Sequence, residues 1–176
     1  EGKARLSTSF PKTHIAITSI DKILPSIHDL ALFWPLLATH GSGQHITVYN
    51  TIFTGAGKKM EPDGPEEMYV ILLDNGRTNI LSDITARESL FCIRCGACLN
   101  VCPVYKNIGG HTYNATYSGP IGSVITPFLN GLKSYKHLSY ASSLCGSCTA
   151  VCPVHINLHE LLLYNRKKSV EADNGS

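Results

Sequence analysis

Four closely spaced cysteines, followed directly by a proline, constrain this chain more than any other feature of its sequence. They lie within residues 92–103 in the pattern C-x2-C-x2-C-x3-C-P, and a shorter copy, C-x2-C-x3-C-P, follows at residues 145–153. This spacing is typical of chains that hold two iron–sulfur cubes. Three cysteines set three residues apart wrap around one cube, and the next cysteine faces the other cube before the proline bends the chain away. The sequence therefore predicts two interlocked [4Fe–4S] clusters.

The crossing pattern assigns each cysteine to one of the two clusters. The thiolates predicted for the first cluster are Cys92, Cys95, Cys98 and Cys152. Those predicted for the second cluster are Cys102, Cys145 and Cys148. Two cubes need about eight ligands. The chain has seven cysteines, so the second cluster lacks one thiolate.

Ser142 occupies the position of the missing thiolate, three residues before Cys145. In one arrangement its oxygen, a water or a partner group completes a [4Fe–4S] cluster. In another, one iron is absent and the cluster is [3Fe–4S]. In the third, His137 or His155 supplies a nitrogen, as histidine does in some clusters. An alkoxide is harder than a thiolate and harder to deprotonate, so a serine-ligated site should be labile. A purely structural role as a helix N-cap fits this serine as well.

The composition narrows both the class of protein and the kind of metal. The 176 residues are 43% apolar and 16% charged with a formal charge of +2, which is typical of a globular chain and offers no basic block for nucleic acid. No apolar run reaches the length of a transmembrane helix. All the cysteines lie in the two motifs, and an odd number in this spacing favours metal over disulfides and predicts a reducing, cytoplasmic location. A zinc ribbon would leave Cys98, Cys102 and Cys152 without a role.

Residues 1–80 predict part of an α/β domain. Strands are expected at residues 13–20, 45–53 and 69–73, the last buried because it is a continuous apolar run. A helix should run from Asp21 to Leu37, with Pro35 kinking or ending it, and residues 55–67 should form an exposed loop. These elements are too few to close a doubly wound fold. The chain begins at Glu1 without a methionine or a signal peptide, so we expect a fragment or a processed piece of a longer protein.

Residues 81–176 predict an all-helical ferredoxin module, so the whole chain is expected in the α+β class. The boundary falls near residues 79–83, where Ser82 or Asp83 caps a helix that leads into the first motif. Further helices are expected at residues 121–132, with an interruption at Pro127, and at residues 158–168, before a frayed tail. The long helical insert between the two motifs is the arrangement of electron-transfer subunits in dehydrogenases.

Several residues near the cysteines allow both a functional and a structural interpretation. Arg94 and Lys106 would raise the reduction potential of a nearby cluster, or they are solvated charges. His111 borders a cluster or a partner, or it is only hydrogen-bonded within its loop. Three small residues let backbone amides approach cluster sulfurs; they are Gly96, Gly146 and Ser147. Three aromatic residues are expected in the core; they are Tyr105, Tyr113 and Tyr117. No catalytic triad, carboxylate pair or GxGxxG motif is visible, so no substrate-cleaving site is predicted.

Five segments resemble one family beyond the cysteines themselves. They are LLDNGR at 72–77, CIRCGACLNVCPVY at 92–105, IGGHTY at 108–113, GPIG at 119–122 and ASSLCGSC at 141–148. Together they are similar to the iron–sulfur protein of the lactate-utilisation system, the LutB family, including its serine at position 142. The chain departs from the family at His40-Gly-Ser-Gly-Gln44, where Ser-Ala-Thr-Gly-Gln is usual.

The resemblance implies a lactate-utilisation (LUD-type) domain joined to a helical two-cluster ferredoxin domain, with both clusters usually [4Fe–4S] and with the ligands assigned above. It further implies an electron-transfer subunit of a complex that oxidises L-lactate to pyruvate together with partner proteins, its clusters forming a one-electron relay. The alternatives are a cluster subunit of the glycolate oxidase or heterodisulfide reductase type, and a structural module whose metal only stabilises a surface for docking partners.

Overall fold

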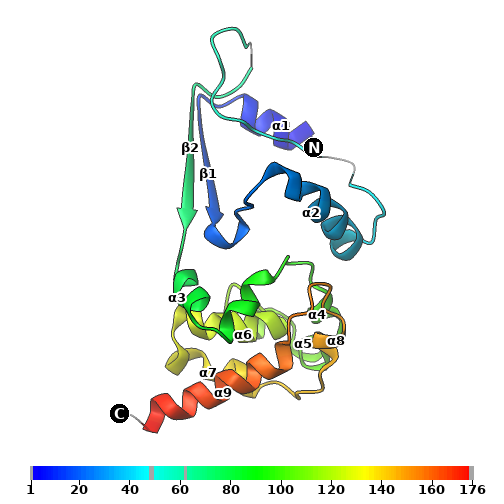
Figure 1. Ribbon diagram of the computed structural model, residues 1–176, viewed down its shortest axis with the longest axis vertical. Helices are drawn as coiled ribbons and strands as arrows, with labels where there is room; N and C mark the ends of the chain where they lie inside the picture. Colours follow the sequence, from blue (N-terminus) through cyan, green and yellow to red (C-terminus); the bar gives the residue numbers. More distant parts are fainter. Residues whose placement is uncertain (1, 48–49, 62, 175–176) are drawn as a thin grey trace.

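The two halves of the chain differ in architecture in the computed structural model, which describes residues 2–47, 50–61 and 63–174. The N-terminal half carries a two-stranded sheet with helices beside it, whereas the described part of the C-terminal half contains helices and no strand (Figure 1). The mixed α+β character expected from the sequence is therefore present. Among the residues that the structure describes, no helix is long and apolar enough to cross a membrane.

The sheet consists of β1 (Thr13–Ser19) and β2 (Glu67–Leu73), which pair in parallel from Thr13 opposite Glu67 to Ser19 opposite Leu73. Both strands confirm predicted ones. The predicted burial of the second strand is wrong, because Val70 is 57% and Leu72 53% exposed. Each strand has a single neighbour, so few side chains from other elements lie against the sheet, and a continuous apolar run remains in contact with solvent.

The segment after β1 differs from the single helix predicted from Asp21. Short 3-10 turns at Ile20–Lys22 and Ile27–Asp29 precede α2 (Leu30–Leu37). The helical stretch begins late because Ser26 and Asp29 form a capping box, in which the Ser26 hydroxyl accepts a hydrogen bond from His28 N–H at 3.2 Å. Pro35 lies inside α2 and does not end it, since the chain continues as a π-helical turn, Ala38–Ser42.

The strand predicted at residues 45–53 is absent from the described residues of that segment. Residues 45–47 and 50–53 have no regular structure, and residues 48 and 49 lie outside the described part of the chain. Phe53 instead packs its ring 5.8 Å from that of His14 on β1. An additional α1 (Gly2–Ser9), which the sequence analysis did not predict, precedes the sheet.

The C-terminal half confirms an all-helical arrangement over its described residues. Its helices are α3 (Arg77–Ser82), α4 (Ala97–Val101), α5 (Pro103–Ile108), α6 (Gly119–Asn130), α7 (Leu132–Tyr140), α8 (Ser147–Ala150) and α9 (Leu158–Asn174), with 3-10 turns at Ala86–Phe91 and His111–Tyr113. Asp83 accepts hydrogen bonds from the N–H groups of Thr85 and Ala86 at the start of the first of these turns, although Thr85 holds its N-cap position. The helix predicted before the first motif is therefore a 3-10 turn instead. Pro127 does not interrupt α6, and α9 continues through residues that were expected to fray.

The core of this half lies between α6, α8 and α9. Val124, Leu158 and Leu162 are at most 1% exposed, and the two buried cysteines Cys98 and Cys148 belong to the same apolar cluster. Burial of this kind is the main source of stability in a small helical domain. The cysteine-bearing segments are therefore packed directly against this buried apolar cluster.

Replacing Gly122 with alanine is expected to destabilise the helical half by about 3 kcal/mol, at the upper end of overpacking effects. An added Cβ would stand 2.2 Å from the backbone oxygen of Tyr117, a group that cannot rotate away. Thermal or chemical unfolding of the variant measures the loss. Gly41→Ala is the matched control, because a Cβ there meets nothing within 4 Å. Equal stability of the two variants would contradict the prediction.

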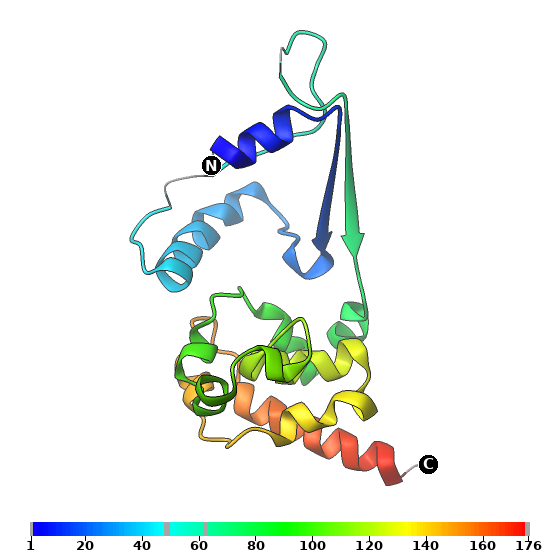
Figure 2. The same cartoon turned by 180° about the vertical axis from the view of Figure 1, so that it is seen from behind.

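Three charged side chains form contacts between the halves, and they are Asp21, Lys22 and Arg77. Seen from either side, the N-terminal half sits at one end of the helical half, and the chain passes from β2 into α3 (Figures 1 and 2). Asp21 accepts a hydrogen bond from Arg77 Nε at 2.7 Å, and both side chains are buried, at 3% and 4% exposure. Lys22 donates to the backbone oxygen of Cys92 at 2.8 Å. Local sequence patterns do not predict these contacts, because the paired residues lie 56 and 70 positions apart along the chain.

Candidate iron–sulfur centre

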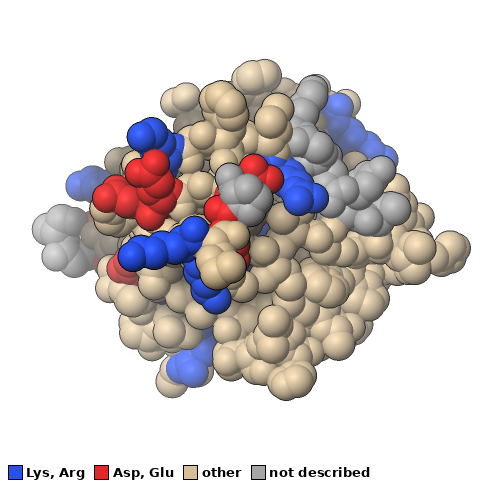
Figure 3. Space-filling view, turned by 90° about the horizontal axis from the view of Figure 1, so that it is seen from above, with Lys and Arg blue, Asp and Glu red and all other residues tan. Residues whose placement is uncertain are grey.

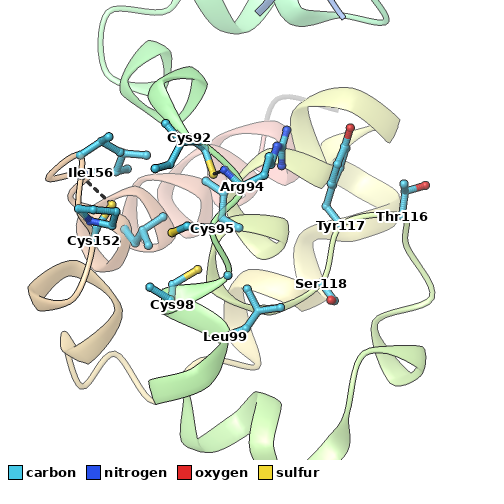
Figure 4. A pocket seen from close by; sticks show the side chains of 17 residues that line it. Cys92, Arg94, Cys95, Cys98, Leu99, Thr116, Tyr117, Ser118, Cys152 and Ile156 are labelled. Atoms are coloured by element: carbon cyan, nitrogen blue, oxygen red, sulfur yellow. Dashed lines mark hydrogen bonds between the residues drawn. The ribbon is translucent and has the colours of Figure 1, made fainter. Parts of the chain in front are cut away.

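The four cysteines predicted for the first cluster line one cavity of about 210 Å³. Cys92 and Cys95 precede α4, Cys98 lies in its first turn, and Cys152 follows α8 (Figure 4). The remaining wall is largely apolar and includes Leu99, Tyr117, Ile121, Ile156 and Leu158. Thiols from both motifs therefore face the same protected space, and this donor set fits an iron–sulfur cluster, which prefers soft thiolate ligands.

Backbone N–H groups point at two of these sulfurs. Arg94 N–H donates to Cys92 Sγ, and Ile156 N–H donates to Cys152 Sγ, both at 3.4 Å. The left-handed conformation of Arg94 (φ 62°) and Gly96 (φ 79°) turns the chain tightly around Cys95. Such N–H contacts favour negative charge on sulfur, so the local backbone suits metal-bound thiolates.

The second motif repeats this backbone. Leu144 (φ 55°) and Gly146 (φ 76°) flank Cys145 as Arg94 and Gly96 flank Cys95, and a short helix with a buried cysteine follows in both cases. Leu144 N–H donates to Ser142 Oγ at 3.2 Å, which is the counterpart of the bond from Arg94 to Cys92. Ser142 is thus structurally equivalent to Cys92 of the first motif.

The second group of cysteines is less enclosed than the first. Cys102 caps α5, accepts a hydrogen bond from Tyr105 N–H at 3.5 Å, and lines with Ser142 a cavity of only about 10 Å³. Cys145 is exposed and Cys148 is buried, and neither lines that cavity. Arg166 on α9 holds the loop between α7 and α8, because it donates a hydrogen bond to the backbone oxygen of Ser142 at 3.0 Å.

Burial controls the acidity of the inward-facing thiols. It raises the pKa of Cys92, and it raises the pKa of Cys98 to about 12. Burial is also the main cause of the raised pKa of Cys148, with smaller contributions from the thiolates of Cys102 and Cys145. A hydrogen bond with Ser147 lowers the pKa of the exposed Cys145. Thiols in such apolar surroundings ionise when a cation is bound, so binding of iron would release protons.

The other predicted residues are distributed unevenly around these sites. Lys106 and His111 are exposed and line neither cavity, and the same cavities lack His137 and His155. Tyr113 is 3% exposed and packs against Tyr105 with ring centroids 6.0 Å apart, in keeping with a core role. Among the described residues, no three His, Cys, Asp or Glu side chains are grouped closely enough to hold a single metal ion.

Comparison with known proteins identifies the two halves. A LUD domain matches residues 1–73, and a 4Fe-4S dicluster domain matches residues 88–156. The chain is 48% identical to lactate utilization protein B of Shouchella clausii over 171 residues and 49% identical to that of Geobacillus sp. (strain WCH70) over 173 residues. These alignments cover 97% and 98% of this chain and 36% of each relative. No solved structure gives a significant match.

The chain therefore belongs to a class of iron–sulfur proteins in which a LUD-domain sequence precedes a 4Fe–4S dicluster sequence. It is a homologue of lactate utilization protein B over nearly its whole length, which confirms the family resemblance found in its sequence. It spans about a third of the length of those relatives, since each alignment covers 36% of the relative.

Proposed function

We propose that the chain is the electron-transfer part of a cytoplasmic complex that oxidises L-lactate to pyruvate. The observation that carries the proposal is the cavity in which four cysteines from both motifs converge. The names of its relatives, which refer to lactate utilization, supply the metabolic context. Bound [4Fe–4S] clusters accept and release single electrons, so two of them would relay the electron pair of a 2-hydroxy-acid oxidation one at a time.

The residues of the first motif have distinct roles in this proposal. The proposed ligands of the first cluster are Cys92, Cys95, Cys98 and Cys152. Leu99 and Ile121 exclude water from the cavity, and Arg94 N–H stabilises charge on the Cys92 sulfur. We propose that residues 81–176 form this ferredoxin domain and that residues 1–80 are part of the LUD domain.

For the second cluster we propose Cys102, Cys145 and Cys148 as ligands, with Ser142 at the fourth position. The support is the equivalence between Ser142 and Cys92, each accepting a hydrogen bond from the residue two positions later. A [3Fe–4S] cluster, with no ligand from Ser142, is the competing arrangement. His137 and His155 line neither cavity, so a histidine ligand has no comparable support.

Replacing Ser142 with cysteine is expected to slow the loss of iron from the second cluster in air by at least about tenfold, because a thiolate is a softer ligand than an alkoxide. Ser142→Ala should do the opposite and convert the site to [3Fe–4S]. Iron content followed over time, together with electron paramagnetic resonance of the oxidised protein, measures both. If Ser142→Ala left the iron content and spectrum unchanged, serine ligation would be refuted.

The proposed function is tested by purifying the protein without oxygen. We expect about eight irons and eight sulfides per chain and two one-electron reduction steps. With its partner subunits the protein should be reduced by L-lactate. Cys148→Ser then distinguishes an electron relay from a metal that only stabilises the fold. If the second cluster is part of the relay, lactate-dependent electron flow should stop in this variant while the fold persists, as monitored by circular dichroism. Fewer than about six irons with no reducible signal would reject the proposal.

A further inference from the structure

The guanidinium of Arg94 lies in the wall of the cysteine-lined cavity and is only partly satisfied. Its central carbon is 4.1 Å from the centroid of the Tyr117 ring (Figure 4). Its Nη1 is buried and has no hydrogen-bond partner in the described part of the chain. A buried donor on a cation costs free energy unless an acceptor is supplied. Arg94 therefore places a fixed positive charge beside the cysteine-lined cavity, and one of its buried donors has no acceptor among the described residues.

Tyr117 holds this guanidinium in place. Its hydroxyl accepts a hydrogen bond from Arg77 Nη2 at 3.1 Å, and Arg77 is in turn fixed by the buried carboxylate of Asp21. Its backbone oxygen packs against Gly122, where no side chain would fit. The ring beneath Arg94 is thus anchored from both halves of the molecule, which makes Tyr117 a positioning residue.

The two motifs differ in charge at this position. Leu144 is the counterpart of Arg94, with the same left-handed backbone and the same N–H donation, here to Ser142. Leu144 packs against the apolar core, whereas Arg94 lines the first cavity and places its guanidinium over the Tyr117 ring. The first motif therefore has a cation at a position where the second motif has an apolar leucine.

We propose that Arg94 raises the reduction potential of the cluster in the first cavity. A cluster gains one negative charge when it takes up an electron, and a fixed cation beside it favours that reduced form. The inference rests on the proposed function, because it requires a cluster bound by Cys92, Cys95, Cys98 and Cys152. Loss of the charge should lower the equilibrium constant for reduction about tenfold, which corresponds to about 59 mV for one electron.

Redox titration of Arg94→Gln, purified without oxygen, tests the proposal. Glutamine keeps a polar side chain of similar reach and removes the charge. We expect one of the two one-electron steps to move to lower potential while the other stays in place. Lys106→Gln is the matched control, because it removes one charge from an exposed position on α5 and should leave the first cluster's step unchanged.

Tyr117→Leu provides a second, independent measurement, since it removes the support of the guanidinium and keeps the charge on the chain. It should shift the same step in the same direction by a smaller amount. Unchanged steps in both Arg94→Gln and Tyr117→Leu would overturn the inference while leaving the proposed function intact. Loss of the first cluster in both would also overturn it, since Arg94 would then serve assembly. Absence of reducible clusters in the unmodified protein would instead reject the proposed function.

Discussion

Replacing Cys98 with alanine is expected to remove about half of the bound iron, from about eight atoms per chain to about four, together with one of the two reduction steps. Cys98 is 9% exposed, lies in the first turn of α4 and lines the cavity with three other cysteines. The neighbouring wall is apolar, so no side chain stands ready to replace the lost thiolate. Iron and sulfide assays after anaerobic reconstitution, with a redox titration, measure the effect.

Two comparison variants make this result specific. Cys148→Ala removes the equivalent buried thiol of the second motif and should cost the other half of the iron. Ser134→Ala, at an exposed position on α7, should retain all of it. A full complement of iron in Cys98→Ala would show that the cavity does not hold a four-thiolate cluster.

Replacing Asp21 with asparagine is expected to destabilise the fold by about 3–5 kcal/mol, the usual cost of leaving one partner of a buried ion pair uncompensated. Asp21 and Arg77 are 3% and 4% exposed, and their atoms are 2.7 Å apart. Loss of the carboxylate would leave the Arg77 guanidinium buried without its partner and free it from the position that anchors Tyr117. Chemical denaturation of the variant and the unmodified chain gives the difference in unfolding free energy.

Glu66→Gln is the control, because its ion pair with Lys12 is 69–83% exposed and should contribute less than about 1 kcal/mol.

The buried pair of Asp21 and Arg77 also predicts that stability depends on pH. Burial opposes ionisation of Asp21, but hydrogen bonds from Ser19 and Lys22 and the charge of Arg77 lower its pKa from 3.8 to about 2. A lowered pKa stabilises the fold above about pH 4, and this contribution is lost as pH falls through about 2. Equal acid sensitivity of Asp21→Asn and the unmodified chain would contradict this assignment.

The sequence predicted the cysteine-lined cavity better than the elements around it. Ligand spacing is a local rule, and the proline after Cys102 and Cys152 follows the same pattern in both motifs, so the convergence of Cys92 with Cys152 could be expected. The helical character of the second half could also be predicted from the sequence, because residues 121–132 and 158–168 have helical periodicity.

Where the prediction failed, tertiary context overrode local preference. Asp21 has the properties of a helix cap, but its partner is Arg77, a residue from the other half. The apolar run at 69–73 has the composition of a buried strand, yet burial depends on neighbours that a local pattern does not specify. The contact between Arg94 and Tyr117 likewise joins two separate loops. The sequence suggested only that the charge of Arg94 lies near a cluster, and it did not indicate Tyr117 as its partner.

The N-terminal half also has a large exposed apolar surface on its sheet. Figure 3 shows most of the charged side chains at the left and centre of this face, with further basic residues at its edges, and a broad surface of other residues at the lower right. Ile15, Ile17 and Val70 of the sheet are more than half exposed. Exposed apolar faces of this extent usually contact another protein segment. Cross-linking from β1 and β2 would show which protein segment contacts this face.

The convergence of Cys92 and Cys152 on one cavity also bears on biosynthesis. The first of these residues leaves the ribosome well before the second, with α6 and α7 between them. The proposed cluster could therefore not acquire its fourth thiolate, from Cys152, until the second motif had been translated. Once bound, it closes that length of chain into a ring and limits the freedom of the unfolded state as a disulfide does.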